Sequence, residues 1–274
     1  MPSLLQFNPQ DLQQYVLNLK AKPQSLVFGR RQYQFQVDDQ LYWLKTQVQG
    51  PSQAHSASFA HELNVYRQLE IASEKNRVVL PFQMFEQNQL NLKGEAVSDV
   101  LILPHAQGWF ETPVNTFTLP QIKKILWQAI DAVEQLWRQA WIHADLKREH
   151  FVVWQGQCKL IDFEQALPLE SSLASSLTAT PRYMAPELFH GQAKSLQSEI
   201  YALGIIFLEW LTAERLHAKS YEDWAYLHCQ RLKVELPNQY LAFKDLVTGM
   251  LSKQKEPRLV DFYHLKSCLM TEFV

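Results

Sequence analysis

An ordered series of acidic and basic residues runs along the chain with spacings that phosphoryl transfer could use. Lys45 ends the strand-like run YWLK, and Glu62 follows it within a helical pattern. Asp145 and Lys147 lie in the stretch HADLKREH, and Asp162 ends the apolar run KLID. Phosphoryl transfer needs a cation on the phosphates of a nucleotide, a carboxylate to hold that cation, and an acid beside the attacking hydroxyl. The chain therefore contains, one after another along the sequence, the residue types that this chemistry needs.

The composition is that of a globular protein with one large domain or two small lobes. The chain has 274 residues, of which 47% are hydrophobic and 20% are charged, and its net charge is −2. This length is sufficient for a sizeable core. The lack of a basic excess disfavours nucleic acid or a membrane surface as a partner.

Nothing in the sequence predicts export or membrane insertion. Its start, MPSLLQFNPQ, lacks the basic leader and apolar core of a secretory signal, and no apolar run reaches the roughly 18 residues of a membrane span. The cysteines Cys158, Cys229 and Cys268 are odd in number and scattered, which fits neither a disulfide framework nor a metal site. We therefore expect a cytoplasmic protein.

The first hundred residues predict a five-stranded sheet with one main helix. Strand composition and turn residues indicate strands at 25–29, 33–37, 41–48, 82–87 and 100–106. Asp38 and Asp39 supply a hairpin turn. We expect a short amphipathic helix near Asp11–Leu19 and the main helix over 57–71. One face of the main helix is apolar and carries Phe59, Leu63, Tyr66 and Leu69.

The rest of the chain predicts helices. The stretch 119–139 is long and amphipathic, with Pro120 in its first turn. Further helices are expected at 196–213, 221–233, 238–251 and 259–271. A sheet-rich part followed by a helical part is an α+β arrangement.

Two downstream motifs are the most specific. The stretch TATPRYMAPELF (178–189) contains an A-P-E sequence, and SEIYALGIIFLEWLT (198–212) follows it. Together with the upstream charged series, they resemble the eukaryotic-type Ser/Thr protein kinases over roughly residues 24–272. Within that resemblance Glu187 is expected to pair with Arg258, and Glu199 replaces an aspartate.

The resemblance implies a bilobal kinase fold and a role for each charged residue. Lys45 and Glu62 would position the phosphates of ATP, and Asp162 would bind a divalent ion, Mg²⁺ or Mn²⁺. Asp145 would orient the attacking hydroxyl and Lys147 would stabilise the transferred phosphoryl group. Thr180 would bridge Asp145 and Lys147.

The segment VLILPHAQG resembles the strand that leads into the kinase hinge. Leu103 would be the gatekeeper, and residues 104–108 the hinge between lobes at 1–103 and 109–274. Pro104 lacks an N–H and would offer its carbonyl to adenine. Ala106 would supply an N–H and a further carbonyl.

The glycine-rich phosphate loop is the first departure from the family pattern. Only Gly29 remains where the family has three glycines, which reduces close backbone approach to phosphates. Arg30 and Arg31 either replace those contacts with side-chain cations or are solvated turn residues, and we favour the solvated alternative.

Ala144 is the second departure, because it stands where an arginine would hold a phosphorylated activation loop. The loop is nevertheless rich in hydroxyls, at Ser171, Ser172, Ser175, Ser176 and Thr178. Without the arginine, we expect that activity does not depend on phosphates at these five positions.

The third departure lies in the metal site. His150 and Glu164 replace the usual asparagine and glycine. His150-Phe151 is similar to the loop of the lipopolysaccharide-core sugar kinases, which share the fold. We therefore expect His150, with Asp162 and Glu164, to be a metal ligand; the alternative is a histidine packed in the core.

The leading interpretation is an ATP-dependent Ser/Thr protein kinase of bacterial style that acts on a protein hydroxyl, its own included. Two alternatives stay open. A small-molecule kinase of the sugar type is favoured by His150-Phe151 and the reduced glycine loop. A pseudokinase that binds without turnover is favoured by the lost glycines.

Overall fold

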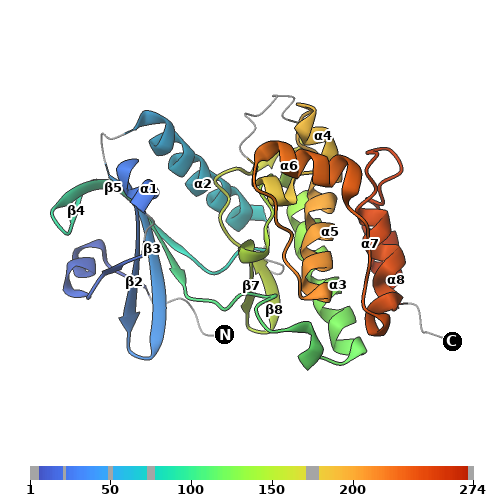
Figure 1. Cartoon of the computed structure of the whole chain (residues 1–274). Helices are drawn as coiled ribbons and strands as arrows, with labels where there is room; N and C mark the ends of the chain where they lie inside the picture. Colours follow the sequence, from blue (N-terminus) through green and yellow to red (C-terminus); the bar gives the residue numbers. More distant parts are fainter. Residues whose placement is uncertain (1–5, 21–22, 49–51, 73–77, 171–178, 271–274) are drawn as a thin grey trace. The chain divides into compact units, whose positions relative to one another are not determined.

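The computed structural model describes residues 6–20, 23–48, 52–72, 78–170 and 179–270. Figure 1 shows the sheet and the helices of the chain, which divides into two compact units. The first unit comprises residues 1–106 and 162–164, and the second comprises 107–161 and 165–274. The boundary after Ala106 falls inside the predicted hinge 104–108. Among the described residues, no helix has the length and apolar character needed to cross a membrane.

An antiparallel sheet forms the centre of the first unit. Its strands are β1 (Asn18–Leu19), β2 (Arg30–Val37), β3 (Gln40–Val48), β4 (Gln83–Leu92) and β5 (Glu95–Pro104), in the order β1-β2-β3-β5-β4. The predicted turn at Asp38 and Asp39 joins β2 to β3, and Asp38 has the positive φ of 51° that a tight hairpin turn favours. Lys45 lies on the central strand β3, opposite Gln32 and Leu101.

Helix α2 (Gln53–Ala72) is the predicted main helix of the first unit. Its four apolar face residues are all buried: Phe59, Leu63, Tyr66 and Leu69. Glu62 is fully buried on the same helix, beside Leu63. The 3.6-residue period therefore places a carboxylate inside an apolar face, and burial of such a group requires a partner.

Two predictions near the start of the chain were wrong. The expected helix at Asp11–Leu19 is instead a 3-10 helix, Pro9–Gln14, followed by strand β1. Asn8 caps this turn by accepting from the N–H of Gln10, and Leu12 is buried in the sheet core. The cap and the leading proline start the turn earlier than the apolar period indicates.

The predicted strand 25–29 is helix α1 (Pro23–Val27). Proline fits the first turn of a helix, and Gly29 ends the turn with φ of 84°. The N–H of Gly29 donates to the carbonyl of Leu26 at 3.0 Å. Val27 and Phe28 are exposed, so their apolar character does not report a buried strand here.

The second unit is mainly helical. Its helices are α3 (Leu119–Arg138), α4 (Pro186–Phe189), α5 (Leu196–Thr212), α6 (Tyr221–Tyr226), α7 (Lys244–Met250) and α8 (Phe262–Met270). Short strands pair as β6 (Trp141–Ile142) with β9 (Leu167–Pro168) and β7 (Phe151–Trp154) with β8 (Gln157–Leu160). Helix α5 is buried from Ser198 to Leu211, as expected of a helix that is apolar on all sides.

The predicted helix boundaries hold for α3 and α5 and shift elsewhere. The predicted helix 221–233 is α6 followed by a π-helical turn, Leu227–Arg231. The predicted helix 238–251 begins as a 3-10 helix, Asn238–Phe243, before α7. Such terminal irregularities carry little sequence signal.

The predicted pair of Glu187 and Arg258 is present and buried. The guanidinium of Arg258 donates to both carboxylate oxygens of Glu187, at 2.6 and 2.9 Å. It also donates to the carbonyls of Gln197 and Ser252 and lies over the ring of Tyr201. The pair thus ties α4 to α5 and to the loop before α8.

We expect Arg258→Met to lower the free energy of unfolding by about 3–5 kcal/mol, because the buried carboxylate of Glu187 loses its cation. The double variant Glu187→Gln with Arg258→Met should lose clearly less than the sum of the two single losses. Urea unfolding of the four proteins measures this. Single losses below about 1 kcal/mol that simply add would show that the pair does not stabilise the unit.

Candidate active site

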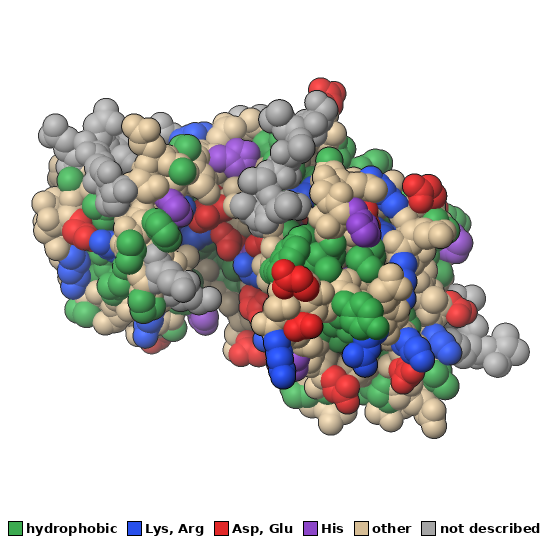
Figure 2. All heavy atoms as spheres, turned by 45° about the horizontal axis from the view of Figure 1, so that its top comes forward, with side chains coloured by type: hydrophobic (Ala, Val, Ile, Leu, Met, Phe, Trp, Pro, Cys, Tyr) green, Lys and Arg blue, Asp and Glu red, His purple; other side chains and the backbone are tan. Residues whose placement is uncertain are grey.

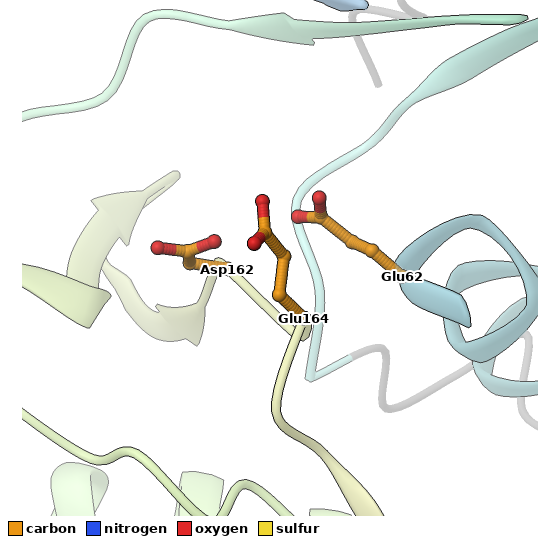
Figure 3. Close-up of side chains that lie close together, drawn as sticks. All are labelled: Glu62, Asp162 and Glu164. Atoms are coloured by element: carbon orange, nitrogen blue, oxygen red, sulfur yellow. The ribbon is translucent and has the colours of Figure 1, made fainter. Parts of the chain in front are cut away.

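Lys45 lies at the centre of a buried charge cluster in the first unit. Its ammonium donates to Glu62 Oε1 and Oε2 at 2.8 and 3.0 Å, and to Asp162 Oδ1 at 2.9 Å. Figure 3 shows the carboxylates of Glu62, Asp162 and Glu164 turned toward one another, Glu62 from α2 and the other two from the segment 162–164. The predicted contact between Lys45 and Glu62 is therefore present. Their predicted role in binding phosphates stays a prediction.

Arg30 belongs to the same cluster, and the expectation that it is a solvated turn residue was wrong. Its Nη1 lies 2.8 Å from Glu164 Oε1 and 3.7 Å from Glu62 Oε2, and only 6% of the residue is exposed. Arg31 is also engaged, because its Nε donates to Glu95 at 2.7 Å. Arg30 and Arg31 are the first two residues of β2, and each contacts an acidic side chain.

Burial and neighbouring charges shift the ionisation of the cluster. Burial disfavours the ammonium of Lys45, but the carboxylates of Asp162, Glu62 and Glu164 outweigh it and raise its pKa. Burial raises the pKa of Glu62 to about 7, against the opposing effect of Lys45. Lys45 therefore stays protonated at neutral pH and is surrounded by carboxylates. A lysine that binds phosphate has to carry this positive charge.

Asp145 is held from two sides in the second unit. Its Oδ1 accepts from the N–H of Thr180 at 3.1 Å and from the hydroxyl of Thr180 at 2.9 Å. Lys147 Nζ donates to Oδ2 at 3.3 Å. Thr180 thus contacts Asp145 as predicted, and Lys147 contacts the other oxygen of the same carboxylate. The predicted contact of Thr180 with Lys147 stays a prediction.

Glu199 supports the backbone that carries Asp145. Its carboxylate accepts from the N–H groups of His143 and Ala144 at 3.0 and 2.8 Å. Ala144 has φ of 64°, a conformation that costs a non-glycine residue about 1 kcal/mol or more. Burial raises the pKa of Glu199 to about 7, against the effect of these two N–H donors. Glu199 therefore holds the backbone just before Asp145.

Lys194 lies beside this loop, and no motif in the sequence indicated it. Its Nζ is buried and has no hydrogen-bond partner among the described residues. It lines a cavity of about 20 Å³ together with Asp145, Thr180 and Glu199. Burial lowers the pKa of Lys194, while the charges of Asp145 and Glu199 oppose that shift. A lysine without helical or strand periodicity offers no sequence signal for such a position.

Leu103 and Pro104, two of the residues predicted to line the adenine, lie at the end of strand β5. Leu103 is buried near the end of β5, and Pro104 pairs with Tyr42 across the sheet. The N–H of His105 donates to the carbonyl of Leu41. Ala106 is the last residue of the first unit before the boundary. The N–H of Gly29 is already donated to Leu26, so this glycine does not present a free amide to a phosphate.

His150 is buried in the second unit. Its ring stacks on that of His143 with centroids 5.0 Å apart, at the end of the 3-10 helix Arg148–His150. Among the described residues, the group able to hold a metal ion consists of Glu62, Asp162 and Glu164, with ligand atoms within 4.8 Å of one another. The assignment of His150 as a metal ligand therefore stays a prediction.

The five hydroxyl residues of the predicted activation loop lie outside the described residues: Ser171, Ser172, Ser175, Ser176 and Thr178. Pro181–Tyr183 forms a 3-10 turn, and α4 begins at Pro186. The expectation about phosphates on the loop stays a prediction.

Comparison with known proteins identifies the family. Residues 37–274 match the family described as the protein kinase domain, and the chain belongs to this family. It is 26% identical over 241 residues to the serine/threonine-protein kinase TIO of Arabidopsis thaliana, covering 84% of this chain and 17% of that protein. The mouse serine/threonine-protein kinases PLK2 and Nek4 are 28% and 30% identical, over 53% and 51% of this chain. The matched regions span 22% and 19% of those two proteins.

His228 packs against α4 and against the segment that precedes it. It is fully buried, its Nδ1 lies 2.9 Å from the hydroxyl of Tyr201, and its ring stacks on Phe189 and Trp224. Burial lowers its pKa from 6.5 to about 4, opposed in part by the backbone carbonyls of Arg182 and Pro181. The folded state therefore holds this ring neutral.

This burial predicts a pH dependence of stability. Between pH 6.5 and about 4 the unfolded state binds a proton that folded His228 does not, so the free energy of unfolding falls as the pH falls through this window. From about pH 8 to about pH 5 the loss due to His228 is about 2 kcal/mol. His228→Phe should remove this part of the dependence. Urea unfolding of both proteins at the two pH values tests it, and parallel pH curves would contradict it.

Proposed function

We propose that the protein is an ATP-dependent kinase that phosphorylates serine or threonine hydroxyls of a protein. The observation that carries this proposal is the carboxylate of Asp145. Thr180 fixes one of its oxygens and Lys147 contacts the other. A carboxylate fixed in this way, on a loop held by Glu199, is suited to accept or orient the proton of an attacking hydroxyl.

The charge cluster of the first unit supports the binding of a nucleotide. Lys45 is a buried cation with a buried carboxylate partner, Glu62. In phosphoryl transfer, such a lysine contacts the nucleotide phosphates while the glutamate holds it in place. Leu103, Pro104 and Ala106 are proposed to line the adenine, with Gly29, the residue before β2, near the phosphates. The reduced glycine content of that loop leaves most of the phosphate binding to side chains.

Asp162 is proposed as the main ligand of a divalent ion. Carboxylate oxygens are the ligands that Mg²⁺ and Mn²⁺ prefer, and the group formed by Glu62, Asp162 and Glu164 supplies them. The ion would neutralise charge on the phosphates of ATP. His150 remains a predicted additional ligand, and Glu164 is a predicted ligand whose two oxygens already contact Arg30 and Ser58.

The acceptor is proposed to be a protein rather than a sugar. Lys147 and the segment ending in Glu187 are typical of kinases that dock a peptide, and the relatives named above are serine/threonine-protein kinases. The sugar-kinase alternative is favoured by His150-Phe151. A pseudokinase is favoured by a different observation, because Lys45 is already bonded to two carboxylates and the N–H of Gly29 is already donated.

Asp145→Asn tests the proposed transfer to a protein hydroxyl. The wild-type protein with ATP and a divalent ion at about 100 times the dissociation constant should gain about 2.7 kcal/mol of stability. The variant should keep this gain, because Asp145 acts on the hydroxyl and not on the nucleotide. It should lose transfer of the γ-phosphoryl group to a protein acceptor by at least about a hundredfold.

Thermal unfolding with and without nucleotide measures the first effect, and transfer from labelled ATP measures the second. Equal turnover by the wild type and Asp145→Asn would show that Asp145 has been assigned wrongly. Binding without transfer in both proteins would support the pseudokinase.

A further inference from the structure

Two residues of the first unit that depart from the family pattern contact each other. Arg30 directly follows Gly29, the one glycine of the predicted phosphate loop, and Glu164 stands where a glycine was expected. Arg30 Nη1 and Glu164 Oε1 are 2.8 Å apart, and the arginine side chain is 7% exposed. An exposed ion pair contributes little to stability. Because the guanidinium of Arg30 is buried, loss of its partner Glu164 would be more costly than loss of a surface contact.

The balance of charge in the cluster depends on Arg30. The ligand atoms of Glu62, Asp162 and Glu164 lie within 4.8 Å of one another. Carboxylates this close repel one another unless cations offset them. Lys45 is one such cation, and it is already bonded to Glu62 and Asp162. Arg30 is a second cation, and it contacts Glu164 directly. The same guanidinium nitrogen lies 3.7 Å from Glu62 Oε2.

The same contacts join three separate parts of the first unit. Arg30 belongs to β2, and its guanidinium lies 4.6 Å from the centre of the Phe59 ring on α2. Ser58, also on α2, donates to Glu164 Oε2 at 3.4 Å. The Phe163 ring packs edge-on against Tyr66 of α2, with centroids 5.2 Å apart. Helix α2 is thus fastened to the segment 162–164 on either side of Glu62.

We propose that Arg30 and Glu164 form a clamp that positions Glu62 and Asp162 around Lys45. Both are positioning residues and neither needs to touch the substrate. The clamp rests on the proposed function, because its purpose is to present Lys45 to the phosphates of ATP. It also assigns Glu164 a role other than the predicted metal ligand, since one of its oxygens is paired with Arg30 and the other accepts from Ser58.

The experiment is a double-mutant cycle with Arg30→Gln, Glu164→Gln and the combined variant. Arg30→Gln leaves three carboxylates to compete for Lys45, so kcat/KM for ATP should fall about tenfold or more, mainly through KM. The combined variant removes one carboxylate as well and should regain most of this loss. Arg30→Lys, which keeps the charge, should lose less than Arg30→Gln.

Arg31→Gln is the matched control. It makes the same change at the neighbouring residue, whose partner is Glu95 and not the cluster. Its kcat/KM should stay within about twofold of the wild type if only the clamp matters. Thermal unfolding of every variant shows whether a loss of rate follows from a loss of folding.

Three outcomes would overturn the clamp. The first is an additive cycle, in which the combined variant loses the product of the two single effects. The second is a loss in Arg31→Gln as large as that in Arg30→Gln. The third is that Glu164→Gln needs a higher metal concentration for activity, while Arg30→Gln leaves kcat/KM unchanged. That result would make Glu164 a metal ligand.

Failure of the proposed function is a separate result. If the wild type transfers no phosphoryl group, the same cycle is measured on the affinity for ATP with a divalent ion, which Lys45 controls in a binding protein too. A coupled cycle in affinity supports the clamp without turnover, and an additive one rejects it.

Discussion

The charge balance around Lys45 is the constraint on which the first unit depends. A buried ammonium is held among three carboxylates, and one further cation, Arg30, lies within the same cluster. Removal of Lys45 would leave the fully buried carboxylate of Glu62 without its nearest cation, which is costly. Strand β2, helix α2 and the segment 162–164 therefore have to be in place together, because each contributes charge that the others neutralise.

A comparable constraint acts on the loop of Asp145 in the second unit. The backbone at Ala144 adopts a conformation unfavourable for alanine, and the buried carboxylate of Glu199 accepts the two N–H groups there. Thr180 then fixes Asp145 from the segment that precedes α4. Glu187, Arg258, Tyr201 and His228 hold that segment against α5. The position of one carboxylate thus rests on a series of buried polar contacts that reaches the loop before α8.

The sequence predicted those parts of the site that the kinase-like motifs and the helical period indicate. The pairs Lys45–Glu62 and Glu187–Arg258 are found as expected; the second pair was predicted from the resemblance to the protein kinases, because Arg258 lies in a loop without a periodic pattern. The helix at Pro23–Val27 was missed, since a short apolar run does not distinguish a strand from a helix and Pro23 and Gly29 decide the outcome. Arg30 was mistaken for a solvated residue, because its partner Glu164 is far away in sequence. Lys194 gave no signal at all, since only the fold brings it beside Asp145.

The most direct test of this account is the fate of the γ-phosphoryl group of ATP. The protein is incubated with γ-labelled ATP and either Mg²⁺ or Mn²⁺, and label is followed into the protein itself, an added protein acceptor and free phosphate. A Lys45 ammonium held ready by its charge cluster and a fixed Asp145 predict label in a serine or threonine of a protein. Label that stays entirely on ATP, in a folded protein that binds the nucleotide, would contradict the account and leave a binding module.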